Sequence, residues 1–182
     1  MVEKRFTNKI VVVTGATQGI GLACAERLHE EGATVCAIQR GQSKLFDSFK
    51  FDLSKEQDCS KSIDVIVKKY GRIDVLVNNA GIMKESSLMD TSLEDWNQTI
   101  SVNLTAPFLL SKFAMPFLIE SEGCIVNIGS IEGIGANPNH AAYCSSKAGL
   151  HGLTRAIAVD HGKDRVRCNA VAPGWIDTEL NE

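Results

Sequence analysis

Hydrophobic residues along the chain fall into two patterns that alternate from one end to the other. The first is a short, almost continuously apolar run rich in β-branched residues, found at residues 9–14, 33–38, 73–77, 124–128 and 166–171. Such runs are typical of strands that are covered on both faces of a sheet. The second pattern is longer and spaces its apolar residues along one face of a helix.

Helical spacing is found in four segments. The first two lie at residues 20–28 and 63–67, and each is followed by a glycine suited to end a helix. Two longer helices are predicted at residues 92–119 and 141–161. Thr91-x-x-Glu94 has the spacing of a capping box, which predicts the start of the first of these long helices.

Alternating strands and helices with short connections predict a fold class. The expected architecture is a doubly wound α/β fold of the Rossmann type, with a parallel sheet and helices on both faces. Residues 41–48 are too few for a crossover helix before the strand-like residues 49–51, so a turn is expected there. No repeat or linker divides the sequence, which predicts one domain over residues 1–182.

Composition and charge limit the partners of such a domain. The 182 residues are 44% hydrophobic and 23% charged, as in ordinary globular proteins, and the formal net charge is −3. This charge argues against a broad nucleic-acid footprint and against an anionic membrane surface. No apolar run approaches the length of a membrane span, and the start of the chain does not resemble a signal peptide. We therefore expect a small-molecule partner.

The six cysteines indicate a reducing compartment. None of them forms a C-x-x-C pair, and several lie inside apolar runs. Free and mostly buried thiols are the expected state, rather than disulfides or a metal site. A cytoplasmic location follows as the default.

A glycine-rich turn joins the first predicted strand to the first helix. Glycines permit a tight turn and close approach to a pyrophosphate, and the helix start offers free N–H groups and a positive dipole end. Its place between strand and helix favours dinucleotide binding over a simple turn. The candidate binding residues in this turn are Gly15, Thr17, Gln18, Gly19, Ile20 and Gly21.

Six motifs in order resemble the short-chain dehydrogenase/reductase family. They are Thr14-Gly15-x-x-x-Gly19-x-Gly21, Asn78-Asn79-Ala80-Gly81, Asn103, Ser130, Tyr143-x-x-x-Lys147 and Pro173-Gly174. The resemblance covers essentially the whole chain, and the spacing differs from the T-G-x-x-G-x-x-G of longer family members that modify sugar nucleotides. It implies an NAD(P)-dependent oxidoreductase that acts on a carbonyl or a secondary alcohol.

The resemblance implies further cofactor contacts. Asp52 and Leu53 are expected to line the adenine pocket, and Ile176 and Thr178 to bracket the nicotinamide carboxamide. Thr14 is expected to tie the Asn-Asn-Ala-Gly turn to the first strand rather than touch the ligand. The cofactor residues expected beyond the glycine turn are Arg40, Asp52, Leu53, Asn79, Ala80, Gly81, Tyr143, Lys147, Pro173, Gly174, Ile176 and Thr178.

The end of the second strand favours NADP and leaves NAD open. An acidic residue there binds the adenosine ribose of NAD, whereas an arginine accommodates the 2′-phosphate of NADP. Here Gln39 stands at the position of the acid and Arg40 follows. Loss of the carboxylate removes repulsion, and a guanidinium binds phosphate with two hydrogen bonds.

Tyr143, Lys147 and Ser130 are the candidate catalytic residues. Tyr143 and Lys147 are four residues apart and project from one helix face. The ammonium, together with a positive nicotinamide, is expected to lower the pKa of Tyr143 so that it exchanges a proton with substrate. Ser130 ends the fifth strand, where its hydroxyl is expected to orient the substrate oxygen.

Asn103 is the fourth candidate catalytic residue. Pro107 has no N–H to donate to the Asn103 carbonyl, so a kink is predicted within the long helix. In the resembled family, an asparagine at this position holds a water that relays protons from the lysine. Of the nearby residues, His140 lies in a loop that should face substrate, where it is expected to be exposed to solvent, with substrate binding as the alternative. Cys144 is expected to lie in the core.

Members of the resembled family continue beyond the Pro-Gly turn into a substrate lid and a last strand, which this sequence does not include. Two hypotheses remain: an oxidoreductase, or a non-catalytic dinucleotide-binding or interaction protein. In relatives the two long helices pair across a two-fold axis, which implies a homodimer or homotetramer. Apolar residues beyond the core-facing stripe of these helices include Phe108, Phe113, Phe117, Leu150 and Leu153.

Overall fold

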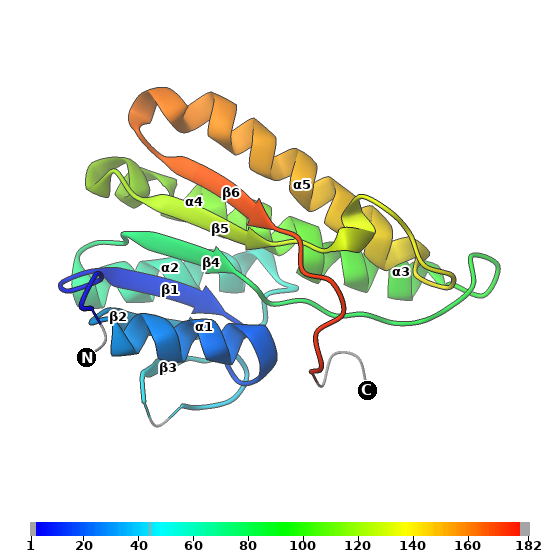
Figure 1. Ribbon diagram of the computed structural model, residues 1–182, viewed down its shortest axis with the longest axis horizontal. Coiled ribbons are helices and arrows are strands. Elements are labelled where there is room, and N and C mark those ends of the chain that lie inside the picture. Colours follow the sequence, from blue (N-terminus) through cyan, green and yellow to red (C-terminus); the bar gives the residue numbers. More distant parts are fainter. Residues whose placement is uncertain (1–2, 44, 179–182) are drawn as a thin grey trace.

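Six parallel strands form one sheet in the computed structural model, which describes residues 3–43 and 45–178 (Figure 1). The order across the sheet is β3-β2-β1-β4-β5-β6. Since the order reverses between β1 and β4, a crevice is expected at the carboxyl ends of these two strands. The strands are β1 (Ile10–Thr14), β2 (Thr34–Ile38), β3 (Asp47–Phe49), β4 (Val75–Asn78), β5 (Cys124–Ile128) and β6 (Arg167–Val171).

Helices cover both faces of the sheet, as the predicted Rossmann-type fold requires. Side chains alternate along β1, so Val11 and Val13 pack toward α1 (Gly19–Glu30), and Val12 packs on the opposite face. That opposite face holds the larger core cluster, covered by α2 (Glu56–Tyr70), α4 (Ala106–Ser121) and α5 (Ala141–His161). Within the described chain, β6 is an edge strand, and its residues are exposed except for Cys168.

The third strand lies two residues earlier than predicted. β3 pairs Asp47, Ser48 and Phe49 with β2, so the prediction of residues 49–51 is wrong at both ends. The Ser48 hydroxyl fixes this register, because it accepts hydrogen bonds from Gln39 Nε2 at 3.0 Å and from the Ser43 N–H at 2.8 Å. Lys50 and Phe51 are thereby released from the sheet.

The long predicted helix has three parts. α3 (Leu93–Ile100) and α4 flank a π-helical turn, Ser101–Thr105, in which the Ala106 N–H donates to the Ser101 carbonyl. Pro107 has no N–H to donate to the Asn103 carbonyl, as the residue at this position of an α-helix would. The wider π-helical turn accommodates the missing hydrogen bond. The sequence predicted a kink here, and the structure has a π-helical turn at this place.

The predicted capping box is wrong by one residue. The N-cap of α3 is Ser92, whose hydroxyl accepts from the Asp95 N–H at 3.0 Å. Thr91 instead donates its hydroxyl to the Ser87 carbonyl at 2.7 Å. Two adjacent hydroxyl residues made the choice ambiguous in the sequence.

One helical stretch, Leu93–Ser121, is long and apolar enough to cross a membrane by length and composition. The apolar runs of the sequence did not predict such a segment. Half of its most apolar window is buried inside the protein, where Leu109, Leu110 and Leu118 join the core. It is the core helix of this fold.

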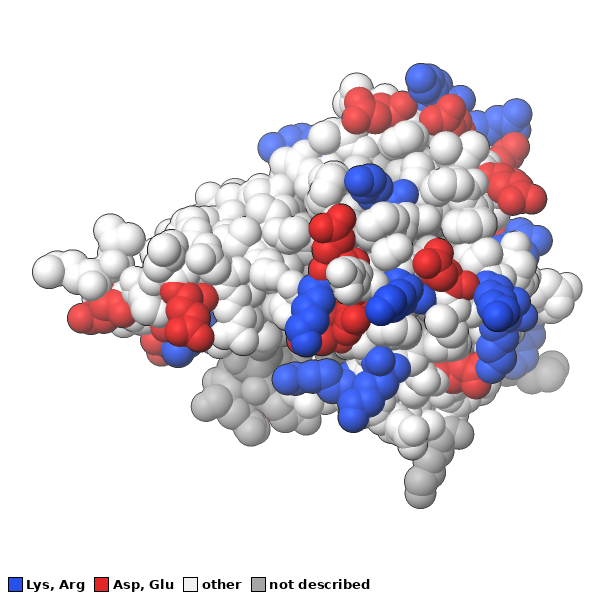
Figure 2. Space-filling view, turned by 180° about the vertical axis from the view of Figure 1, so that it is seen from behind, with Lys and Arg blue, Asp and Glu red and all other residues white. Residues whose placement is uncertain are grey.

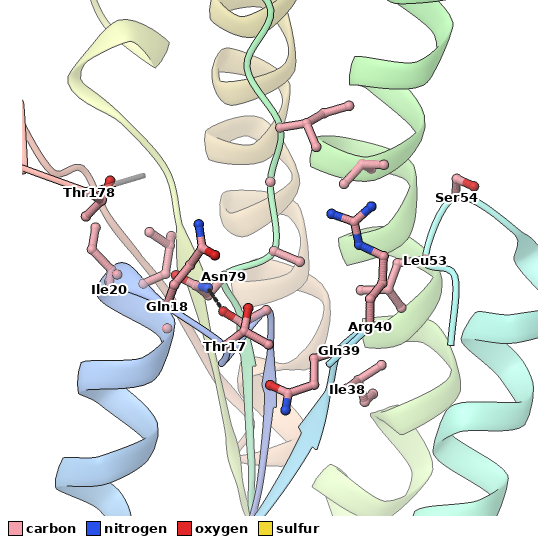
Figure 3. Close-up of a pocket in the computed structure, with 18 of the residues that line it drawn as sticks. Thr17, Gln18, Ile20, Ile38, Gln39, Arg40, Leu53, Ser54, Asn79 and Thr178 are labelled. Carbon is pink, nitrogen blue, oxygen red and sulfur yellow. Dashed lines mark hydrogen bonds between the residues drawn. The ribbon is translucent and has the colours of Figure 1, made fainter. Parts of the chain in front are cut away.

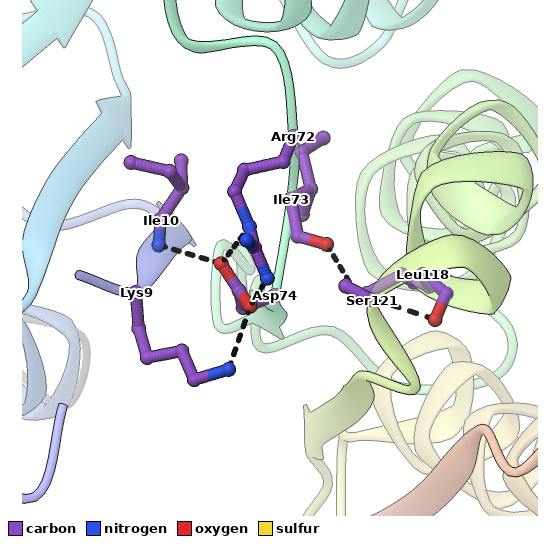
Figure 4. A network of polar contacts seen from close by, with 7 residues as sticks. All are labelled: Lys9, Ile10, Arg72, Ile73, Asp74, Leu118 and Ser121. Atoms are coloured by element: carbon purple, nitrogen blue, oxygen red, sulfur yellow. Dashed lines mark hydrogen bonds and ion pairs between the residues drawn. The ribbon is translucent and has the colours of Figure 1, made fainter. Parts of the chain in front are cut away.

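Buried carboxylates near the amino-terminal edge of the sheet are held by permanent cations. Asp74 accepts from Lys9 Nζ and the Ile10 N–H at 3.0 and 2.9 Å, and Arg72 contacts both of its oxygens (Figure 4). Burial alone raises the pKa of Asp74, but these donors outweigh it and lower the pKa. Glu31 is bound in the same way by Arg5 and Arg27, which lower its pKa to about 2.

Candidate active site

A cleft with a volume of about 920 Å³ opens at the carboxyl edge of the sheet, where the strand order reverses. This is the size of a small-molecule or cofactor site. Every residue predicted to contact the cofactor lines it: Gly15, Thr17, Gln18, Gly19, Ile20, Gly21, Arg40, Asp52, Leu53, Asn79, Ala80, Gly81, Tyr143, Lys147, Pro173, Gly174, Ile176 and Thr178.

The glycine turn leaves room for close approach of a ligand. Gly15 and Gly19 have φ of +66° and +54°, a left-handed conformation that side chains disfavour. A Cβ on Gly21 would lie 2.2 Å from the Gly15 carbonyl oxygen, so only glycine fits there. Among the described residues no side chain caps the start of α1, and its first turn holds no acid, so its first N–H groups suit an anion.

The Asn-Asn-Ala-Gly turn is fastened to the glycine turn by side chains. The Thr14 hydroxyl accepts from the N–H groups of Asn79 and Ala80, both at 2.9 Å, which confirms the predicted tie. Asn79 Nδ2 donates in return to the carbonyls of Thr14 and Gly15 at 3.0 and 2.9 Å. The two turns therefore form one rigid floor under the cleft.

The end of β2 presents one buried amide and one exposed cation. Gln39 is 5% exposed, and its Oε1 has no hydrogen-bond partner among the described residues. Arg40 is exposed and makes no ion pair within the described part of the chain; its guanidinium rises beside Leu53 (Figure 3). This end of the cleft can therefore take a ligand that donates a hydrogen bond to Gln39 and presents an anion to Arg40.

Asp52 lines the cleft with a carboxylate that already has partners. Its Oδ1 accepts from the backbone N–H and the hydroxyl of Ser54, at 3.1 and 2.7 Å, and Lys55 lies 3.3 Å from Oδ2. The hydrogen bonds from Ser54, more than the charge of Lys55, lower the pKa of Asp52. Its contact with an adenine amine stays a prediction.

Ser130, Tyr143 and Lys147 lie together at the other end of the cleft. All three are buried, with exposed fractions of 8, 7 and 4%. Lys147 Nζ donates to the Ile128 carbonyl at 2.7 Å and lies 5.5 Å from the centre of the Tyr143 ring. The Ser130 hydroxyl also caps a short 3-10 turn, Ile131–Gly133, by accepting from the Glu132 N–H at 3.1 Å.

Burial raises the pKa of Tyr143 in the protein alone. The charge of Glu132 adds to the rise, and hydrogen bonding with Ser130 opposes it. The lowering expected from Lys147 together with a positive nicotinamide stays a prediction. Burial also lowers the pKa of Lys147 to about 8.

Asn103 does not line the cleft. Its Oδ1 accepts from the Ile82 N–H at 2.8 Å, and its Nδ2 donates to the Ile82 carbonyl and to the Ser146 hydroxyl at 2.9 and 3.1 Å. The side chain therefore joins the loop after β4 to α5, one residue before Lys147. A water held by its carbonyl stays a prediction.

Known proteins resemble this chain over nearly its whole length. The model of the short chain dehydrogenase family matches residues 9–182. Meso-2,3-butanediol dehydrogenase from Serratia marcescens is 38% identical, with coverage of 97% of this chain and 74% of the relative. 3-Oxoacyl-[acyl-carrier-protein] reductase FabG from Thermotoga maritima is 36% identical, with coverage of 98% and 78%. The chain belongs to the short-chain dehydrogenase family.

Solved structures agree with this assignment. The aldohexose dehydrogenase of Thermoplasma acidophilum, in ligand-free form, superposes with a TM-score of 0.93 at 41% identity and covers 98% of this chain and 71% of its own. Levodione reductase superposes with a TM-score of 0.92 at 31% sequence identity, and the match covers 97% of this chain and 75% of its own. The family is one of oxidoreductases that generally bind a nicotinamide dinucleotide.

Two residues of this short-chain dehydrogenase are placed differently from the predictions. His140 is buried, 3% exposed, rather than in solvent, and its Nδ1 lies 2.8 Å from a carboxylate oxygen of Glu132. Cys144 is partly buried and donates its thiol to the same carboxylate at 3.4 Å, so it is not a core residue. Glu132, which the sequence analysis did not single out, holds both.

Other cleft residues were also missed by the motif search. Lys50 and Phe51 directly follow β3. Because ligands of such sheets bind at the carboxyl ends of strands, this position could have indicated both residues once the end of β3 was known. The described cleft residues outside the predicted set also include Ile38, Gln39, Gly41, Ser54, Asp58, Ile82, Gln98, Val102, Ile128 and Gly129. No cluster of three or more His, Cys, Asp or Glu side chains suited to a metal occurs among the described residues.

Proposed function

We propose that this short-chain dehydrogenase is an NADP(H)-dependent oxidoreductase that acts on a carbonyl or a secondary alcohol. The observation that carries the proposal is one cleft with two chemically different ends. One end has a glycine turn, a free helix start and Arg40; the other has Ser130, Tyr143 and Lys147. A long cofactor and a small substrate need such an arrangement.

The residues of the cleft fit a dinucleotide. The Gln39 Oε1, which has no hydrogen-bond partner among the described residues, can accept from a ribose hydroxyl. The N–H groups at the start of α1 suit a pyrophosphate. When bound, the nicotinamide supplies or accepts the hydride. Thr178 lies against Gly19: its Cγ2 is 3.1 Å from the position that a Cβ on Gly19 would take. The segment after β6 therefore borders the glycine turn.

Tyr143 is the general acid in reduction and the general base in oxidation. Its phenol donates the proton to the carbonyl oxygen or takes it from the alcohol. Burial raises the pKa of Tyr143, which favours the protonated phenol over the phenolate. Ser130 orients the substrate oxygen, and Lys147, with its pKa of about 8, supplies a nearby positive charge and donors for ribose hydroxyls.

Arg40 is the basis of the NADP preference. The exposed Arg40 guanidinium makes no ion pair among the described residues and is available to a 2′-phosphate, and Gln39 brings no negative charge against it. A charge-assisted hydrogen bond contributes about 1.5–3 kcal/mol, or roughly ten- to a hundredfold in affinity.

Fluorescence titration of the protein with NADPH and NADH tests this preference. NADPH is expected to bind more tightly, and Arg40→Gln is expected to remove the difference by weakening NADPH alone. Arg155→Gln, an exposed change on α5, is the matched control. Equal affinities for the two cofactors in the parent protein contradict the NADP assignment.

A panel of carbonyl compounds tests the reaction. The names of the relatives suggest its members: a small diketone or hydroxyketone, a 3-oxoacyl thioester and an aldohexose with oxidised cofactor. Cofactor consumption in at least one assay is expected. Tight cofactor binding without turnover on any member would favour the non-catalytic alternative.

The protein is further proposed to form a homodimer or homotetramer through α4 and α5, and to work in the cytoplasm. Phe108, Ile119 and Val159 are 47, 38 and 81% exposed on these helices. Leu150 does not contribute to this exposed surface, since it is buried. Three further apolar residues of these helices are partly buried against the core: Phe113, Phe117 and Leu153. Charged side chains gather over one half of the face in Figure 2 and leave much of the rest uncharged. Sedimentation showing only monomer at micromolar concentration contradicts this assembly.

A further inference from the structure

A buried carboxylate lies behind the serine and the tyrosine of the cleft. Glu132 is 7% exposed and stands two residues after Ser130, to whose hydroxyl its backbone N–H donates. Its carboxylate lies 2.8 Å from His140 Nδ1 and accepts from Asn137 Nδ2 at 2.9 Å and from the Cys144 thiol at 3.4 Å. A buried charge with this many specific partners is held in one position.

Two partners of Glu132, His140 and Cys144, belong to the start of the helix that carries Tyr143. His140 immediately precedes α5, and its carbonyl accepts from the Cys144 N–H at 2.8 Å. The imidazole meets the Tyr143 ring edge-on, with 6.3 Å between ring centres and 72° between planes. One carboxylate therefore joins the turn of Ser130 to the first turn of α5.

We propose that Glu132 is a positioning residue that fixes Ser130 against Tyr143, and that its charge, compensated by His140 when the imidazole is protonated, controls how readily Tyr143 releases its proton. The catalytic consequence rests on the proposed function of Tyr143. The electrostatic coupling itself is a property of the protein alone.

The charges around the pair determine its pH response. Tyr143 faces Glu132, Cys144, His140 and Lys147, while His140 also faces Glu85, whose Oε1 lies 3.4 Å from Nε2. Burial lowers the pKa of His140, but Glu132 and Glu85 outweigh it and raise the pKa. Once His140 loses its proton, the charge of Glu132 is no longer compensated, and it raises the pKa of Tyr143.

Tyr143 is directly observable because the chain has only 2 tyrosines. The other, Tyr70, lies at the end of α2 and bonds Asp47, outside the cleft. In a Tyr70→Phe chain labelled with ¹³C at tyrosine Cζ, NMR gives one signal whose pH titration reports Tyr143. The measurement needs no substrate or cofactor, so it separates this proposal from the proposed enzymatic function.

Three substitutions in the Tyr70→Phe chain test the coupling. Glu132→Gln keeps the shape and removes the charge, so the Tyr143 midpoint is expected at lower pH than in Tyr70→Phe alone. His140→Gln is expected to leave the midpoint unchanged, because the imidazole is already neutral where the phenol titrates. Glu132→Asp, which retains the charge, is expected to bring the midpoint back toward that of the unsubstituted position.

Two results overturn the proposal. One is a Tyr143 midpoint that Glu132→Gln does not move. The other is an equal shift in Glu132→Gln and His140→Gln, which indicates general loosening of the loop. Should Glu132→Gln fail to fold, the Tyr70→Phe chain still decides: its Tyr143 signal is expected to show a second inflection at the pH where His140 titrates, and the lack of one contradicts the coupling.

Discussion

The two edges of the sheet hold buried charges in opposite ways. Near the amino-terminal edge, the buried carboxylate of Asp74 forms ion pairs with Lys9 and Arg72 (Figure 4). At the carboxyl edge, Glu132 faces a histidine, and Lys147 donates to a backbone carbonyl oxygen and makes no ion pair among the described residues. Fixed counterions make the first edge a source of stability, whereas titratable partners make the second a source of reactivity.

The pKa values express this difference. Lowered carboxyl pKa values, as in Asp74, mean that the folded state gains stability from the ionised group. For Lys147, a fall from 10.5 to about 8 means that folding disfavours the ammonium, by about 3 kcal/mol at pH 7. The Lys147 ammonium therefore lowers the stability of the fold, which is expected of a group that serves catalysis.

The largest expected effect comes from Lys147→Met, which removes the charge and keeps much of the volume. Turnover is expected to fall by at least ~10²–10⁴ and NADPH affinity to weaken, since the lysine serves both. The free energy of unfolding at pH 7 is expected not to fall, because the desolvated ammonium is gone. Steady-state kinetics and urea unfolding measure the two quantities. A Lys147→Met variant that unfolds more easily and still turns over substrate would contradict the assignment of stability to one edge of the sheet and reactivity to the other.

Asp74→Asn is the counterpart at the opposite edge. The loss of charge-assisted hydrogen bonds to a buried group is expected to lower the free energy of unfolding by about 1.5–3 kcal/mol and to leave turnover unchanged well below the melting temperature. Since the pKa of Asp74 is lowered, its stabilisation is present above about pH 4 and disappears as pH falls through the folded pKa. Urea unfolding from pH 7 to pH 2 measures this, with the exposed Asp64→Asn as control.

The smallest effect is expected from His140→Gln on the pH dependence of stability. The pKa of His140 is raised in the folded state, so its stabilisation is complete below about pH 6.5 and is lost as pH rises through the folded value. The parent protein is therefore expected to exceed the variant in stability by more at pH 6 than at pH 9. Thermal melts at both pH values check this, and a difference that grows with pH contradicts it.

Motifs predicted the cleft better than they predicted the interactions behind it. The glycine turn, Tyr143 and Lys147 are recognisable because a short local spacing implies their geometry. Glu132 and His140 are eight residues apart in a segment without periodicity, and only the fold brings them together. The raised pKa of Tyr143 has the same origin, since burial depends on the whole structure rather than on its neighbours in sequence.

The fold was predicted in its main features because burial imposes a strong hydrophobic pattern. Strands such as β1 and β5 are apolar at four of their five residues, whereas β3 has only three residues and is fixed by the Ser48 hydroxyl. The helix start at Ser92 rather than Thr91 also depended on which hydroxyl found a backbone donor. Short elements and caps are set by single hydrogen bonds, which a sequence pattern does not resolve.

Tyr143→Phe tests the central claim most directly, because it removes one hydroxyl and leaves the ring in place. The parent protein and the variant are compared with NADPH and a carbonyl compound that the parent reduces, after cofactor affinity has been measured for both. The expected result is unchanged NADPH affinity with turnover lower by at least ~10²–10⁴. Near-normal turnover in the variant would contradict the account, because the proton would then come from another group.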